Sequence, residues 1–235
     1  MNRISSTILI LLCAWAMACC GGSDDQSGTL LPSGLQLHAG DVVLRLGNSM
    51  ASHAVTALDS QGEYSHTGIV VDSCGVKMVV HAVPDEPDYE GDPDRVKMET
   101  PEEFFATSRA LSGEILRPTD SVAASRAAAA AMEAYHRHTL FDHRYDDHDT
   151  VSMYCTELVT HAYHRAGVEL VGEERHHIST PWIEVWCMFP SDLLRSPFLK
   201  SVCLIRPANE ETNATVKGMA AEEMERNPCK SELTK

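Results

Sequence analysis

The sequence contains no cluster of lysine and arginine residues. Its 19 basic residues are outnumbered by 34 aspartates and glutamates, which gives a formal net charge of -15 at pH 7. Proteins that bind nucleic acids neutralise the phosphates with grouped basic side chains. We therefore expect no nucleic-acid partner.

Two common cysteine and histidine motifs are also absent. No Cys-x-x-Cys pair occurs, which argues against a zinc ribbon and against a thioredoxin-like redox site. No His-Glu-x-x-His motif occurs, and the stretch 136–149, with His136, His138, His143 and His148, fits no metal-ligand spacing. We interpret this stretch as a solvated acidic loop and expect the protein to need no metal and no cofactor.

The apolar run near the N-terminus is too short for a comfortable membrane span and is typical of a secretion signal. Small residues before Cys19 resemble the lipobox of bacterial lipoproteins, in which the cysteine is lipidated; ordinary cleavage after Ala18 is the alternative. We expect a lipoprotein signal over residues 1–18 and a flexible tether, rich in Gly and Ser, over residues 19–36. The protein would then be exported and anchored by a lipid on Cys19 to a bacterial membrane, facing the periplasm or the cell surface.

The rest of the chain is long enough for one buried domain. Of the 235 residues, 43% are hydrophobic and 23% are charged, which is ordinary for a globular protein. We expect this domain to span residues 37–207. Residues 208–235 contain no aromatic residue and few large aliphatic ones, so we expect a loosely ordered tail.

Local patterns predict strands and helices along the domain. Apolar, β-branched runs bounded by turn residues predict strands near residues 40–46, 64–71, 76–83, 95–100, 113–118 and 201–207. Caps and helix-forming residues predict helices at 49–59, at 101–108, from 121 to about 138, where eight alanines occur, and from Cys155 to about Gly167.

The two strands at 64–71 and 76–83 each contain a histidine. If the turn at 72–75 closes with Val71 opposite Val76, then His66 lies directly opposite His81. Opposed side chains share one face of a sheet and lie close enough for the two rings to hydrogen-bond. We expect His81 to hold His66 in one tautomer, which is what a general base needs from its orienting partner.

Cys155 is the best nucleophile candidate because it lies where an acidic loop becomes a helix. The free N–H groups and the dipole of a helix N-terminus favour a thiolate, so we expect a lowered thiol pKa and a possible role of these groups in stabilising an oxyanion. Without that context a cysteine is most often a buried core residue. The other cysteines of the domain and tail have no partner base and are interpreted as structural or incidental: Cys74, Cys187, Cys203 and Cys229.

Several of these motifs, in this order, resemble the YiiX/YaeF-type permuted papain-like amidases, relatives of the NlpC-type cell-wall peptidases. The resemblance covers roughly residues 38–206 and rests on residues 40–43, 64–70, 141–142, 154–159 and 189–194. It implies an α+β, circularly permuted papain-like fold with an antiparallel sheet or small barrel packed with helices. It also implies that Cys155 is the nucleophile, that His66 is the base and that His81 orients His66.

The position of His81 departs from the family pattern, since many relatives carry Glu there. The related lecithin retinol acyltransferase group has a second histidine at this place. Tyr154 is a possible oxyanion or substrate contact, although packing under the helix is the favoured interpretation of that residue.

The expected function is hydrolysis of an amide bond, in a peptide, a cell-wall peptide or an N-acyl amino acid, through an acyl-enzyme on Cys155. One alternative is a lipid-directed thiol acyltransferase or esterase, and another is a non-catalytic lipoprotein of the cell envelope with a binding role. The partner would be a small peptide, amide or lipid-like substrate, chosen by the loops at residues 84–95 and 168–188.

Overall fold

The computed structural model describes residues 28–59, 62–146, 148–180 and 184–207. The predicted signal segment, the lipidation site Cys19 and the tail from residue 208 lie outside the described residues. None of the helices in these ranges is long and apolar enough to cross a membrane. In chain order the elements are β1 (Val42–Gly47), α1 (Met50–Leu58), β2 (His66–Ser73), β3 (Val76–Val83), β4 (Arg95–Glu99), α2 (Pro101–Phe104), β5 (Ala110–Pro118), α3 (Ser121–His136), β6 (Leu140–Phe141), β7 (Ser152–Met153), α4 (Cys155–Arg165), β8 (His176–Ser179), β9 (Glu184–Cys187), α5 (Pro190–Leu194) and β10 (Leu199–Ile205).

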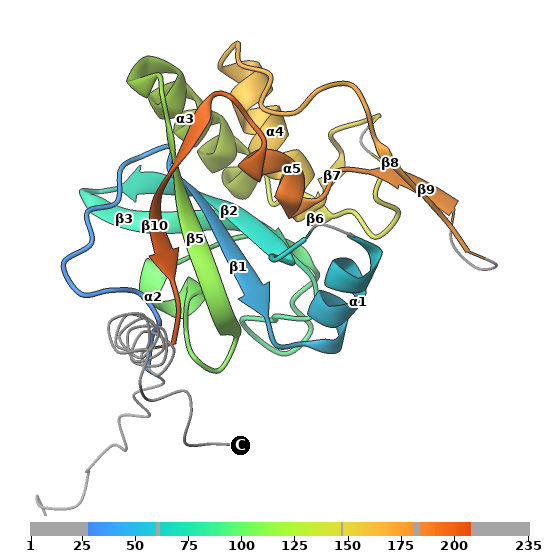
Figure 1. Cartoon of the computed structure of the whole chain (residues 1–235), viewed down its shortest axis with the longest axis horizontal. Coiled ribbons are helices and arrows are strands. Elements are labelled where there is room, and N and C mark those ends of the chain that lie inside the picture. Colours follow the sequence, from blue (N-terminus) through green and yellow to red (C-terminus); the bar gives the residue numbers. More distant parts are fainter. Residues whose placement is uncertain (1–27, 60–61, 147, 181–183, 208–235) are drawn as a thin grey trace, which may run out of the picture.

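Eight of these strands form one curled sheet, a half-barrel, in the order β10-β5-β1-β2-β3-β4-β6-β7 (Figure 1). Neighbouring strands are antiparallel except for the parallel pair β6 and β7. A separate hairpin, β8–β9, projects from one end of the molecule (Figure 1). The predicted α+β class is confirmed, whereas this hairpin lies in a segment for which only a loop was predicted.

Both faces of the sheet are covered, which explains why its central strands are buried almost throughout. Helices α3 and α4 pack on one face over residues such as Val42, Leu44 and Ile69. On the other face, Val43 and Val70 belong to a second cluster with Phe104 and Phe105 at the end of α2. Successive residues of β1 therefore enter different cores, as the two-residue period of a strand requires.

Small residues let α3 approach the sheet closely. Asp120 caps this helix by accepting hydrogen bonds from the amides of Val122 and Ala123, and most of the alanines of the helix are buried. Gly40, with a φ of 91°, lies so near the helix that an added Cβ would be 2.5 Å from the Cβ of Ala124. This packing also supports α4, which lies against α3 and begins at Cys155.

Residues 28–36 of the predicted tether lie against the folded domain. The amide of Leu30 donates to the carbonyl of Phe105 over 2.9 Å, and the amide of Thr107 donates to the carbonyl of Gly28 over 2.7 Å. Leucines at positions 30, 31 and 35 pack against the cluster around Phe104. The hydrophobic effect explains this packing. The leucines cover the apolar cluster on the face of the sheet that α2 also covers.

Candidate active site

The hairpin β2–β3 has a different register from the predicted one. Val71 pairs with Met78 and Ser73 pairs with Val76, so the pairing is displaced by two residues. The cause is a tight turn in which only Cys74 and Gly75 connect the strands, both with positive φ values, 55° and 84°. A shift of two residues keeps every side chain on its face, and His66 and His81 become diagonal neighbours instead of opposed ones.

The two histidines nevertheless meet. His66 Nε2 lies 2.9 Å from His81 Nδ1, and both rings are buried. The diagonal contact needs space beside His81, which Gly68 provides: a Cβ there would lie 3.1 Å from the Cβ of His81 and 2.7 Å from a methyl group of Val79. Phe104 of α2 packs against both imidazoles, with ring centroids 5.7 Å from His66 and 5.4 Å from His81.

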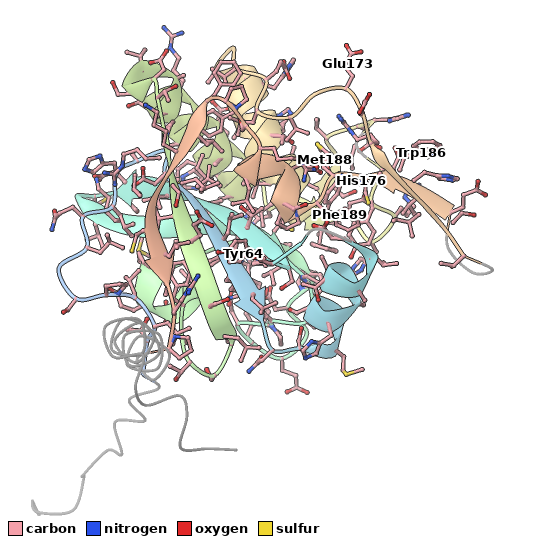
Figure 2. All side chains as sticks on the ribbon, in the orientation of Figure 1. Tyr64, Glu173, His176, Trp186, Met188 and Phe189 are labelled. Carbon is pink, nitrogen blue, oxygen red and sulfur yellow. The ribbon has the colours of Figure 1, made fainter. Side chains whose placement is uncertain are left out.

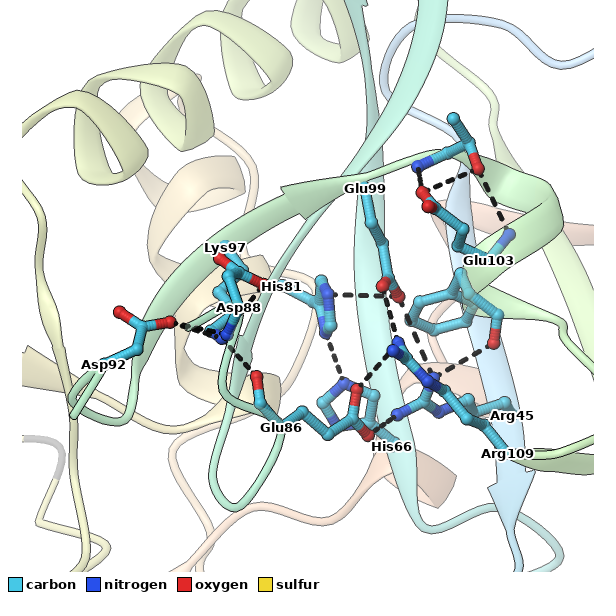
Figure 3. A network of polar contacts seen from close by, with 12 residues as sticks. Arg45, His66, His81, Glu86, Asp88, Asp92, Lys97, Glu99, Glu103 and Arg109 are labelled. Carbon is cyan, nitrogen blue, oxygen red and sulfur yellow. Dashed lines mark hydrogen bonds and ion pairs between the residues drawn. The ribbon is translucent and has the colours of Figure 1, made fainter. Parts of the chain in front are cut away.

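Glu99 continues this chain of contacts, and sequence reasoning missed it. Its Oε1 lies 3.2 Å from His81 Nε2, and its Oε2 accepts a hydrogen bond from Arg109 over 2.7 Å (Figure 3). Glu99 lies on β4, two residues from Lys97, which is the pairing partner of His81. Knowing that β3 pairs with β4 would have placed Glu99 near His81. Local sequence patterns do not tell which strands pair.

Buried charges around the histidines are paired. Arg45 forms a short contact with Glu86 and donates to the carbonyl of Phe104 over 3.0 Å, with its guanidinium 4.7 Å above the Phe104 ring. Arg109 bridges Glu86 and Glu99 (Figure 3). Burial alone disfavours a carboxylate, but the contact with His81 and the charges of Arg109 and Arg45 hold the pKa of Glu99 at about 2. Glu99 is therefore anionic at physiological pH.

The base candidate, His66, is neutral at physiological pH. Burial, the charge of Arg45 and the neighbouring His81 lower the pKa of His66 well below its usual value of 6.5. Its side chain lines a cavity of about 300 Å³, and Cys155 lines the same cavity. Because His66 Nε2 is engaged by His81, Nδ1 is the nitrogen of His66 that remains for a thiol.

Cys155 is the first residue of α4, as predicted, and it is partly buried at the cavity wall. The expected lowering of its pKa is wrong. Burial raises the pKa of the thiol, and the Thr156 hydroxyl, 3.9 Å from Sγ, together with amide groups of Thr67, Thr156 and Cys155, offsets this only in part. Desolvation thus outweighs the helix N-terminus, and at rest the Cys155 thiol and the His66 imidazole are both neutral.

Tyr154 is buried below the helix, although it also reaches the cavity wall. Its hydroxyl accepts a hydrogen bond from the amide of Met188 over 3.1 Å. Its own amide donates to Glu157 Oε2 over 3.2 Å. The contact with Met188 joins the start of α4 to the segment after β9. There Met188 and Phe189 lie beside α5, while Trp186 lies farther out along the hairpin (Figure 2).

The four histidines of the stretch 136–149 do not line this cavity, although Phe141 and Tyr145 of the same stretch do. His143 is exposed and contacts Asp94 over 3.0 Å, and His148 is exposed near Asp146. Across the described residues, no group of three or more His, Cys, Asp and Glu side chains could hold a metal ion. Of the remaining cysteines, Cys74 is exposed in the hairpin turn and Cys203 is partly exposed on β10, while Cys229 lies outside the described ranges.

Comparisons with known proteins agree with this geometry. A family model described as the permuted papain-like amidase enzyme, YaeF/YiiX, matches residues 36–203. Among solved structures, the crystal structure of a protein described as the metalloprotein yiiX from Escherichia coli O157:H7 matches with a TM-score of 0.58 and 19% identity, covering 74% of this chain and all of the other. A comparison with curated proteins found no match. The resemblance drawn from the sequence and the predicted papain-like fold are thereby confirmed.

Proposed function

Because the chain belongs to the YaeF/YiiX family of permuted papain-like amidases, we propose that it hydrolyses amide bonds through an acyl-enzyme on Cys155, with His66 as the base. Membership in this family makes the chain a cysteine-type hydrolase. The assignment of residues rests on one observation: His66, held by the buried His81, lines the same cavity as a cysteine at a helix N-terminus.

In the proposed reaction, His66 Nδ1 takes the thiol proton while Sγ of Cys155 bonds to the carbonyl carbon of the substrate. The backbone amides that interact with the sulfur, those of Thr67, Thr156 and Cys155, are the expected donors for the oxyanion. The C–N bond then breaks, and the amine leaves with the proton held by His66. A water molecule, deprotonated by His66, attacks the thioester and releases the acid and the thiol.

The proposed roles of His81 and Glu99 follow from which ring nitrogen donates a proton in the contacts between His66, His81 and Glu99. If Nδ1 of His66 accepts the thiol proton, Nε2–H donates to Nδ1 of His81, and Nε2–H of His81 then faces Glu99. The Glu99 carboxylate stabilises the positive charge that His66 gains during the reaction. This favourable interaction opposes the effect of burial and of Arg45, both of which disfavour that charge.

Neither the family nor the fold identifies the substrate. The location of the protein in the cell envelope is likewise part of the proposal. Anchoring through Cys19 would place the substrate in the cell envelope, as expected for a cell-wall peptide or an N-acyl amino acid. The solved neighbour is described as a metalloprotein. The described residues of this chain do not fit such a site, so no step of the proposed mechanism involves a metal.

Acylation by 4-nitrophenyl acetate tests the proposal. After rapid acid quenching, peptide mass spectrometry should find the acetyl group on Cys155. Since the pKa of His66 is lowered and that of Cys155 is raised, the neutral pair persists from well below pH 6.5 to above pH 9. The acylation rate should therefore be nearly constant between about pH 6.5 and about pH 9 and should fall only in more acidic solution.

Acetylation spread over several cysteines or lysines, with no preference for Cys155, would favour the competing function, a non-catalytic lipoprotein that binds its ligand. If the acylation rate fell as the pH dropped below about 6.5, the pKa of His66 would not be lowered, which would contradict the burial and the charges described around that residue. The matched control is Cys203, which is also partly exposed and whose pKa burial also raises. Cys203 has no histidine partner in the described contacts, and its acetylation should be slow.

Glu99→Gln should lower kcat about 10- to 100-fold with little change in KM, the range typical of partners that orient an active-site group. Glutamine keeps the size of the side chain but removes the charge that favours protonated histidine. The acidic limb of the pH profile should therefore move to still lower pH. The control is Glu102→Gln, on the adjacent turn, where the side chain is exposed. If a folded Glu99→Gln protein had the kcat of the wild type and the same acidic limb in its pH profile, Glu99 would have no role in the mechanism.

A further inference from the structure

A second cavity, of about 390 Å³, lies between α5 and the loop that joins α4 to β8. None of its lining residues lines the cavity beside Cys155. The two cavities are nevertheless neighbours. His176 lines the second cavity and Phe189 lines the first, and the centroids of their rings are 5.1 Å apart (Figure 2). The proposed reaction uses no residue of the second cavity.

A buried carboxylate organises the second cavity. The side chain of Asp192 is 8% exposed, and its Oδ2 accepts a hydrogen bond from the amide of Phe189 over 2.7 Å. Its Oδ1 accepts a hydrogen bond from His176 Nε2 over 2.9 Å and also forms a short contact with Arg195. A carboxylate that accepts several donors holds them in fixed positions. Asp192 thus positions a guanidinium and an imidazole in one wall of the cavity.

The basic groups of this cavity are accessible to a ligand, whereas the buried carboxylate is not. The side chains of Arg195 and His176 are 50% and 41% exposed. Arg175 adds a second guanidinium, and its Nη1 donates to the carbonyl of Gly172 in the same loop over 2.8 Å. The chain has 34 acidic and only 19 basic residues, so two arginines in one cavity do not follow from its composition. They indicate a site for an anion.

The acidic residues of the loop limit the charge of this anion. Glu174 lines the cavity and is exposed. Glu173 does not line it and points outward from the molecule (Figure 2). Arg175 and Arg195 are therefore opposed by two carboxylates, those of Glu174 and Asp192. A lining with this balance favours a single carboxylate over a dianion such as phosphate.

The remaining walls suit a small aliphatic group. Leu170, Val171 and Pro197 line the cavity together with the charged residues. The volume is at the small end of the range for small-molecule sites. It matches a ligand of the size of an N-acyl amino acid, whose carboxylate and aliphatic side chain would meet the two kinds of wall.

We propose that the second cavity binds the carboxylate of such a ligand through Arg175 and Arg195, with an aliphatic group against Leu170 and Pro197. This site does not depend on the proposed catalysis. Two sources share the chemistry: a free acyl amino acid or short peptide, and a carboxylate that is part of the amide bound beside Cys155.

Isothermal titration calorimetry of the Cys155→Ala protein with N-acetyl-L-leucine tests the proposal, and this variant is used so that hydrolysis does not consume the probe. The acid should bind saturably, and uncharged N-acetyl-L-leucinamide should bind about tenfold more weakly or not at all. Arg175→Gln and Arg195→Gln should each weaken binding of the acid about tenfold, since a charge-assisted hydrogen bond is lost. Glu174→Gln should strengthen it about two- to fivefold, because a repelling charge is removed.

Arg165→Gln is the matched control. Arg165 is 47% exposed and pairs with Glu133 over 3.2 Å, much as Arg195 pairs with Asp192, but it lines neither cavity. This variant should bind the acid as tightly as its parent. The proposal is overturned by the absence of saturable binding, by equal affinity for the acid and the amide, or by an affinity that neither Arg175→Gln nor Arg195→Gln lowers. Tighter binding of inorganic phosphate than of the acid also overturns it.

Steady-state kinetics of the wild-type protein identify the source of the carboxylate. The 4-nitrophenyl half-esters of glutaric and adipic acid are compared with the uncharged pentanoyl and hexanoyl esters, which have the same number of acyl carbons. If the carboxylate belongs to the substrate, the half-esters should have the higher kcat/KM, and Arg195→Gln should abolish the difference. If a free ligand occupies the site, the half-esters should gain nothing. Binding of the acid by a protein that shows no hydrolysis would overturn the proposed function and leave this site in place.

Discussion

Cys155→Ala should lower kcat for ester and amide hydrolysis by about 10⁴-fold or more, because the reaction loses the atom to which the acyl group bonds. The protein should stay folded. Cys155 is only partly buried at the cavity wall, and its contact with Thr156 is 3.9 Å long, so alanine removes little packing. Steady-state hydrolysis of 4-nitrophenyl acetate and the thermal unfolding midpoint measure the two effects separately.

Cys203→Ala is the control for this variant, since it also removes a partly exposed thiol with a raised pKa. It should leave hydrolysis unchanged. If Cys155→Ala were folded and retained more than about a tenth of wild-type activity, the acyl-enzyme mechanism would be wrong. If Cys155→Ala lost both its activity and its cooperative unfolding transition, the variant would be unfolded. Cys155→Ser, which nearly keeps the volume and the polarity of the side chain, would then be measured in its place.

His66→Ala should lower kcat by about 10³- to 10⁴-fold at neutral pH, because a neutral thiol with a raised pKa has lost its base. The pH profile should change shape as well as height. Without the base, only the thiolate reacts, so the rate should rise about tenfold per pH unit up to the pKa of Cys155. Wild-type protein should show no such rise across the same range.

The control is His53→Ala, which removes an exposed histidine of α1 that does not line the cavity. The double variant Cys155→Ala with His66→Ala should be no slower than Cys155→Ala alone, because residues that act as a unit are not additive. A further loss in the double variant, or a flat pH profile in His66→Ala, would indicate that another group activates the thiol.

Local signals were sufficient for much of the fold. The caps of α1 and α3, the glycine after α4 and the alternation in the strands are all encoded within a few residues, so the positions of α1 to α4, β1 to β5 and β10 followed from the sequence. The short elements β6 to β9 and α5 did not. The hairpin register did not, because it depends on the backbone of Cys74. A cysteine with a φ of 55° is uncommon, and only with that conformation do two residues suffice to close the turn.

Long-range contacts account for what the sequence did not reveal. Glu99 reaches His81 only because β4 lies beside β3, and residues 28–36 are ordered only because α2 and the sheet present an apolar surface. The thiol pKa was also misjudged for a non-local reason. Its helix position was visible in the sequence, whereas the burial that overrides the helix N-terminus comes from elements far along the chain.

The order of the strands also bears on how the domain folds. β2 supplies His66 and α4 supplies Cys155, and between them in the chain lie β3, β4, β5 and α3. The final strand, β10, returns to pair with β5 in the same sheet. Such a topology has a high contact order, and closing its long loops costs entropy before the contacts form. In a partly folded chain, His66 and Cys155 are therefore not yet brought to the same cavity, and we expect hydrolytic activity only from the completed domain.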